Sequence, residues 1–82
     1  MTKEKRIADV RKFHIKYIYA KHKKDGFKTS AYFGLEERAK QLLRNEYEVT
    51  EEEVNEIIRR TDEEIEKAGI EADQFVALYH SL

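Results

Sequence analysis

The 82-residue chain contains no cysteine, no proline and no tryptophan. Without cysteine it can form neither a disulfide framework nor a thiolate metal site, and it has no cysteine nucleophile. Small secreted domains usually depend on disulfides, so the absence of cysteine favours a cytoplasmic protein. Because proline breaks helix interiors, a chain that has none is well suited to being mostly helical.

Long hydrophobic runs are also missing. The longest apolar run covers residues 75–79, far short of the roughly 20 residues that a membrane-spanning helix needs. The basic N-terminus has no apolar core, so we expect no signal peptide. With 40% hydrophobic and 40% charged residues, the chain is too apolar for a disordered tail, and its length suits a single helical domain over residues 1–82.

Apolar residues recur at helical spacing in four segments, and no segment shows the strict alternation of a half-buried strand. This periodicity predicts an all-α fold. We expect a compact bundle of three main helices with a short C-terminal helix, at about residues 3–24, 31–47, 51–68 and 72–81.

Local signals predict where these helices begin and end. Gly26 is expected to end the first helix in the left-handed conformation, and Thr29 or Ser30 to cap the second. Residues 50–53, Thr-Glu-Glu-Glu, form the capping-box pattern at the start of the third helix. Thr61 begins a second pattern of this kind, so the sequence leaves open whether the third helix is continuous there.

The near-neutral net charge hides an uneven distribution. Residues 1–44 carry 13 Lys or Arg against 5 Asp or Glu, whereas residues 45–82 carry 3 against 12. In the first helix a basic stripe lies between two apolar stripes, and the candidate surface for a protein or nucleic-acid partner comprises Lys5, Lys12, Lys16, Lys23, Arg11 and Tyr19. In the third helix the candidate acidic docking surface comprises Glu52, Glu56, Glu63 and Glu66.

No catalytic arrangement is recognisable. His14 falls on the apolar face of the first helix, where a histidine can act as a general base or a pH-sensitive contact, but a partly buried histidine bonded to a tyrosine or a carboxylate explains the position better. The histidines lack the spacing of a helical metal site, and the glycines suit turns and caps rather than a phosphate loop. We therefore expect no enzymatic activity, no metal, no cofactor and no small-molecule substrate.

These patterns favour a small, non-catalytic helical protein that binds another protein or a second copy of itself, and its size suits a regulatory or accessory protein of a bacterium or phage. The alternative is a nucleic-acid-binding accessory protein that uses the basic first helix. Asp9 interrupts the basic stripe and the whole chain is slightly acidic, which weakens this alternative. The sequence does not decide whether the basic first helix faces the acidic third helix or stays free for a partner.

Overall fold

The computed structural model describes residues 2–70 and 73–80. These residues contain no strand and four helices: α1 (Lys3–His22), α2 (Gly26–Tyr47), α3 (Glu51–Ala68) and α4 (Asp73–His80). The predicted all-α bundle of three main helices and a short fourth is confirmed. The predicted ends of the last helix, at 72 and 81, lie outside the described residues.

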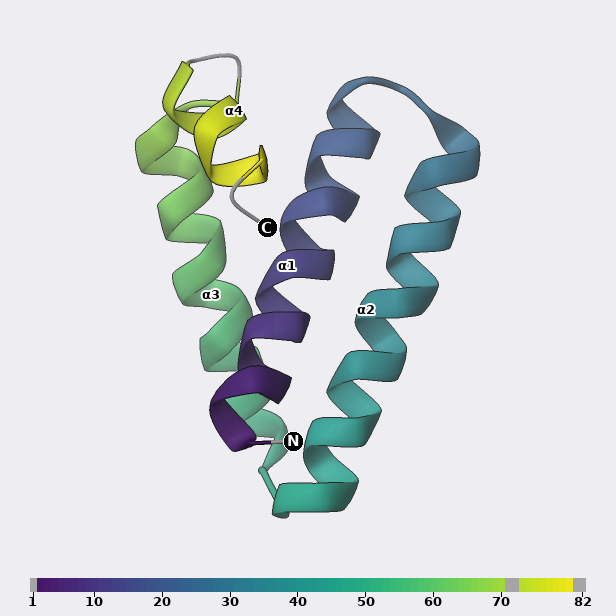
Figure 1. The fold of residues 1–82 in the computed structure, drawn as a ribbon, viewed down its shortest axis with the longest axis vertical. Helices are drawn as coiled ribbons and strands as arrows, with labels where there is room; N and C mark the ends of the chain where they lie inside the picture. Colours follow the sequence, from purple (N-terminus) through teal and green to yellow (C-terminus); the bar gives the residue numbers. More distant parts are fainter. Residues whose placement is uncertain (1, 71–72, 81–82) are drawn as a thin grey trace.

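Helix α1 lies at the centre of the molecule. It runs between α2 and α3, which come together at the loop that joins them and diverge towards the other end of the molecule (Figure 1). Helix α4 lies beside α1 and α3 at this divergent end (Figure 1). Because α1 contacts every other helix, it needs apolar residues on more than one side, which is why its sequence shows two apolar stripes.

The core consists of two clusters at different heights along α1. The first joins α1, α2 and α3 and contains Val10, Ala39, Leu43, Val49 and Val54. The second joins α1, α3 and α4 and contains Ile15, Ile65 and Phe75. Since α4 has only eight residues, it is too short to be stable alone and depends on its contacts in the second cluster.

The turn between α1 and α2 differs from the prediction. Lys24, and not Gly26, adopts the left-handed conformation, with a φ of 58°. The Lys24 N–H donates to the Lys21 carbonyl and the Asp25 N–H donates to the Ala20 carbonyl, both at 3.1 Å. These are the two hydrogen bonds of a Schellman motif. Because they close at Lys24, α1 ends two residues earlier than predicted and Gly26 becomes the first residue of α2.

Helix α2 therefore begins five residues before its predicted start. Its N-cap is Asp25, whose side chain accepts a hydrogen bond from the Lys28 N–H at 3.0 Å. The predicted caps, Thr29 and Ser30, lie inside the helix, where the Thr29 hydroxyl donates to the Asp25 carbonyl at 2.7 Å. Aspartate is as good an N-cap as serine or threonine, so the predicted linker at 25–30 is replaced by the cap and first turn of α2.

Helix α3 has the predicted boundaries and is continuous through Thr61. The Thr50 hydroxyl accepts from the Glu53 N–H at 3.1 Å, and the Glu53 carboxylate accepts from the Thr50 N–H at 3.4 Å, which confirms the capping box. Thr61 is fully buried, and its hydroxyl donates to the Ile57 carbonyl at 2.8 Å. The second capping pattern is therefore unused, because the Thr61 side chain bonds back within the helix.

Candidate functional site

The lysine stripe of α1 has few acidic partners. Lys5 lies 3.7 Å from Asp9 of the same helix. The other three lysines of the stripe make no ion pair with any described residue, although the acidic α3 packs against α1. Instead each ammonium group lies within 6 Å of an aromatic ring: Lys12 over Phe13 at 5.2 Å, Lys16 over Tyr32 at 5.8 Å and Lys23 over Tyr19 at 5.5 Å. Cation–π contacts hold these cations in place without neutralising them.

The two remaining residues of the candidate basic surface make contacts within the molecule. Arg11 forms an ion pair with Glu64 of α3. Tyr19 stacks on Phe75 and Tyr79 of α4, with ring centroids 5.4 and 4.5 Å apart. Tyr19 is thus used to hold α4 on α1, and the accessible basic surface is narrower than the sequence suggests.

The acidic surface of α3 is partly neutralised by the helix itself. The Glu56 carboxylate binds Arg59 and also Arg60, and these guanidinium groups lower the pKa of Glu56 to about 2. Arg59 also forms an ion pair with Glu63. Glu52 and Glu66 make no ion pair with the described residues. The acidic surface is therefore strongest at the two ends of α3.

A buried network around His14 links three helices. Its Nδ1 lies 2.5 Å from Oε1 of Glu36 in α2, and its Nε2 lies 2.6 Å from Oδ1 of Asp62 in α3. The second oxygen of Glu36 lies 2.9 Å from Nζ of Lys40. The side chains of His14 and Glu36 are only 8% and 5% exposed. The histidine thus has the carboxylate contact that the sequence suggested, but it makes two such contacts rather than one.

The network is electrostatically consistent only when His14 is charged, because both ring nitrogens must donate to carboxylates. Burial by itself lowers the pKa of His14, but the hydrogen bonds to Glu36 and Asp62 outweigh it and raise this pKa above its ordinary value. Burial likewise raises the pKa of Glu36, and the bonds from His14 and Lys40 reverse this and lower it. With both nitrogens engaged, His14 has no lone pair for a substrate or a metal. Among the described residues, no group of three or more His, Cys, Asp or Glu side chains is arranged so that it could hold a metal ion.

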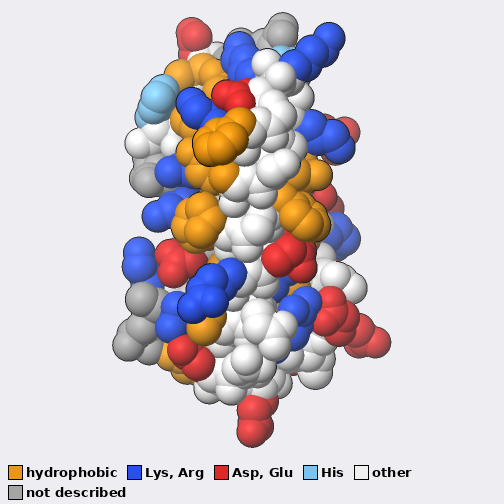
Figure 2. Space-filling view, turned by 90° about the vertical axis from the view of Figure 1, so that its right-hand side faces the viewer, with side chains coloured by type: hydrophobic (Ala, Val, Ile, Leu, Met, Phe, Trp, Pro, Cys, Tyr) orange, Lys and Arg blue, Asp and Glu red, His pale blue; other side chains and the backbone are white. Residues whose placement is uncertain are grey.

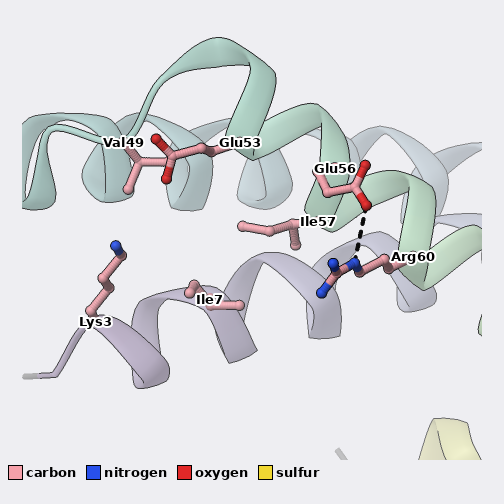
Figure 3. Close-up of a pocket in the computed structure, with 7 residues that line it drawn as sticks. All are labelled: Lys3, Ile7, Val49, Glu53, Glu56, Ile57 and Arg60. Carbon is pink, nitrogen blue, oxygen red and sulfur yellow. Dashed lines mark hydrogen bonds and ion pairs between the residues drawn. The ribbon is translucent and has the colours of Figure 1, made fainter.

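A shallow groove lies between α1 and α3, which we call the α1–α3 groove. Its volume is about 220 Å³, and it is lined by Lys3, Ile7, Val49, Glu53, Glu56, Ile57 and Arg60. Ile7 of α1 and Ile57 of α3 form its apolar floor, and Arg60 binds Glu56 beside it at 3.1 Å (Figure 3). The charges that line this groove include both signs, so it has no strong preference for a partner of either charge.

A second groove, which we call the α1–α2 groove, lies on another side of α1. Its lining has two arginines and one acidic residue, whereas the charges of the α1–α3 groove are balanced. The α1–α2 groove has a volume of about 210 Å³ and is lined by Arg6, Asp9, Phe13, Leu35, Arg38, Ala39 and Leu42. Leu35 is 41% exposed, and Lys12 adds a cation at the edge because its ammonium group lies over the Phe13 ring. On the α2 side of the molecule, hydrophobic side chains reach the surface among lysines, arginines and acidic residues (Figure 2).

Sequence reasoning missed the α1–α2 groove. Leu35 and Leu42 have the same helical spacing as the buried residues of α2, so periodicity assigns them to the core. Two aromatic side chains, Phe27 and Phe33, are also exposed, at 85% and 49%. None of the described helices is long and apolar enough to cross a membrane.

The comparisons with known proteins give no relative. No protein-family model matches the chain, and neither a curated protein nor a solved structure matches it. The function therefore has to be inferred from the surfaces and contacts described above.

Proposed function

We propose that this chain is a small, non-catalytic helical module that acts in the cytoplasm as a regulatory or accessory protein by binding another protein. The observation that carries the proposal is a row of three lysines on α1, Lys12, Lys16 and Lys23, that make no ion pair with the described residues. The ammonium group of Lys12 lies over Phe13, which lines the α1–α2 groove together with the exposed Leu35. Cations next to exposed apolar side chains are typical of an interface that uses charge for steering and apolar contacts for affinity.

Binding to a second copy of the chain is less well supported. The obvious acidic surface to meet the lysines is the outward face of α3, where Glu56 and Glu63 are already bound by Arg59. Val54 and Ile65 of α3 are buried, and Ile57 and Ile58 are partly buried against the core. A second copy would therefore offer charge to the lysines but little apolar surface.

Nucleic-acid binding remains the second candidate. The lysines that make no ion pair with the described part of the chain lie along one helix, as phosphate-binding residues do. However, Asp9 lies on the same stripe, and an exposed leucine contributes nothing to a phosphate backbone.

Capture from a lysate of the native host tests the proposal. The bait is compared with a stripe variant, Lys12→Glu with Lys16→Glu and Lys23→Glu, and with a matched control in which Lys24→Glu, Lys28→Glu and Lys67→Glu change the net charge equally. We expect one protein to be retained by the wild type and the control and lost by the stripe variant. Identical sets of captured proteins from all three baits would contradict the proposal.

Two further measurements separate the other possibilities. Sedimentation over a range of concentrations detects a dimer, which would support binding to itself. Electrophoretic shifts with generic DNA and RNA at low salt detect nucleic-acid binding, which should weaken steeply as salt rises. If the wild type and the control bind nucleic acid and the stripe variant does not, the partner of the lysines is nucleic acid and not a protein.

A further inference from the structure

The floor of the α1–α2 groove has the spacing of a helix-binding site. Leu35 and Leu42 are seven residues apart, so they lie on one side of α2, roughly 10 Å apart along its axis. Ala39 lies between them, and Phe13 completes the floor from α1. An α-helix that runs alongside α2 presents apolar residues at positions i, i+3 or i+4, and i+7 over the same length.

The edges of this floor are cationic on both sides. From α1, Lys12 lies over Phe13 and Lys16 lies over the ring of Tyr32, three residues before Leu35 in α2. From α2, Arg38 lines the groove and makes no ion pair with the described residues. The single acidic residue in the lining, Asp9, is bound to Lys5. An apolar strip bordered by cations is complementary to a helix with an apolar stripe bordered by acids.

On the basis of the proposed function, we propose that the α1–α2 groove binds an acidic amphipathic α-helix of the partner protein. The partner helix places large apolar side chains at i, i+3 or i+4, and i+7 on the floor formed by Phe13, Leu35 and Leu42. Its flanking Asp or Glu residues contact Lys12, Lys16 and Arg38. The apolar contacts supply most of the affinity, and the ion pairs at the edge supply specificity and speed of association.

The other surfaces of the molecule fit such a helix less well. The lining of the α1–α3 groove contains Glu53 and Glu56 as well as Lys3 and Arg60, so this groove does not favour an acidic partner. The exposed Phe27 lines neither the α1–α2 groove nor the α1–α3 groove. Helix α3 of a second copy is acidic, but Val54 and Ile65 are buried and Ile57 and Ile58 are partly buried against its own core, so it has little apolar surface to place on Leu35.

Titration with a synthetic helix tests the inference. The probe is a labelled peptide of about 18 residues, long enough to be helical in water when rich in alanine, with leucines at i, i+3 and i+7 and glutamates at the flanking positions. One control peptide replaces the leucines with serine, and another replaces the glutamates with lysine. Fluorescence anisotropy measures binding, and methyl NMR spectra identify the side chains that the peptide contacts.

We expect the acidic amphipathic peptide to bind and to shift the methyl signals of Leu35, Ala39 and Leu42. Leu35→Ser and Lys12→Glu should each weaken binding about tenfold, which corresponds to 1.4 kcal/mol. Val76→Ser alters a residue of nearly equal exposure, 38%, on α4 and should change nothing. Absence of saturable binding, equal binding of the serine or lysine control peptide, or equal binding by Leu35→Ser would each overturn the inference.

The same variants separate this inference from the proposed function. If a captured native partner is lost by the stripe variant but retained by Leu35→Ser, the protein still binds a partner through its lysines and the helix-binding groove is wrong. If the stripe variant also retains everything that the wild type captures, the proposed function itself fails. A nucleic-acid complex that depends on Lys12 but not on Leu35 would likewise overturn the groove.

Discussion

The imidazole Nδ1 of His14 lies 2.5 Å from Oε1 of Glu36, in the interior of the bundle. The other ring nitrogen contacts Asp62 at 2.6 Å. One cation on α1 therefore holds a carboxylate from α2 and a carboxylate from α3, two helices that diverge from each other (Figure 1). We infer that this network fixes the position of all three helices near the middle of the molecule.

The first prediction concerns the pH dependence of stability. The pKa of His14 in the folded protein lies above its ordinary 6.5, so its stabilising charge is complete below pH 6.5 and is lost as pH rises through the folded pKa. The pKa of Glu36 lies below its ordinary 4.5, so its contribution is complete above pH 4.5 and is lost as pH falls through the folded pKa. The pair should stabilise the fold most between these two values.

Urea unfolding at about pH 5.5 and about pH 8.5 measures this dependence. His14→Gln should lower the free energy of unfolding by roughly 2 to 3 kcal/mol at the lower pH, because Glu36 loses its buried partner. It should also flatten the decrease in stability between the two pH values. His80→Gln, at an exposed position of α4, is the control and should keep the wild-type decrease. A decrease of full size in His14→Gln would assign the pH dependence to other groups.

The second prediction separates the two carboxylates that bind Lys40. Glu36 is 5% exposed and lies 2.9 Å from Nζ of Lys40, whereas Glu37 is 46% exposed and lies 3.1 Å from it. Glu36→Gln should cost about 3 kcal/mol, since it leaves the buried charge of His14 with one carboxylate. Glu37→Gln should cost less than about 0.5 kcal/mol, as is usual for exposed ion pairs.

An NMR titration of the two variants gives a second measure. Glu36→Gln removes a hydrogen bond that raises the pKa of His14, so His14 should titrate at lower pH than in the wild type. Glu37→Gln should leave the titration of His14 unchanged. Equal effects of the two substitutions on stability and on His14 would show that burial does not control the strength of this network.

The third prediction concerns the docking of α4. Phe75 is fully buried and its ring stacks on Tyr19, with centroids 5.4 Å apart. Phe75→Ala should cost about 3 kcal/mol and should leave the amides of α4 unprotected in hydrogen exchange, because eight residues do not form a stable helix alone. Val76→Ala, at the neighbouring and 38% exposed position, should cost less than about 1 kcal/mol. Full amide protection of α4 in Phe75→Ala would refute this account.

The fourth prediction concerns the turn between α1 and α2. Lys24 has a φ of 58°, a conformation that costs an ordinary side chain roughly 1 kcal/mol and glycine almost nothing. Lys24→Gly should therefore raise the free energy of unfolding by about 1 kcal/mol. Lys23 has a φ of −78°, so Lys23→Gly gains no relief of strain and should be neutral or destabilising by up to about 1 kcal/mol. Effects of the same sign in thermal unfolding of both variants would contradict the assigned turn.

Much of the helical structure follows from local patterns. The capping box of Thr50 and Glu53 involves groups three residues apart, so it is visible in the sequence and has the same geometry in the fold. The start of α2 also depends on local sequence, but Asp25, Thr29 and Ser30 are all of a type that can cap a helix. Asp25 is used because α1 closes its Schellman motif at Lys24, and the next residue then has the extended conformation that an N-cap requires.

The buried network around His14 depends on contacts between residues far apart in the sequence, which no local pattern predicts. The partners of His14 are 22 and 48 residues away, and only the packing of α2 and α3 against α1 selects Glu36 and Asp62 from the many carboxylates of the chain.

The helices follow from local sequence, because periodicity and capping act between residues within one or two turns of each other. Which of the apolar residues reach the surface depends instead on how the helices pack. Leu42 and Leu43 follow each other in α2, yet Leu43 is fully buried and Leu42 lines the α1–α2 groove. That difference depends on the direction from which α1 packs against α2, which brings together residues far apart in the chain. The same packing leaves Lys12 and Lys16 without an acidic partner among residues 2–70 and 73–80.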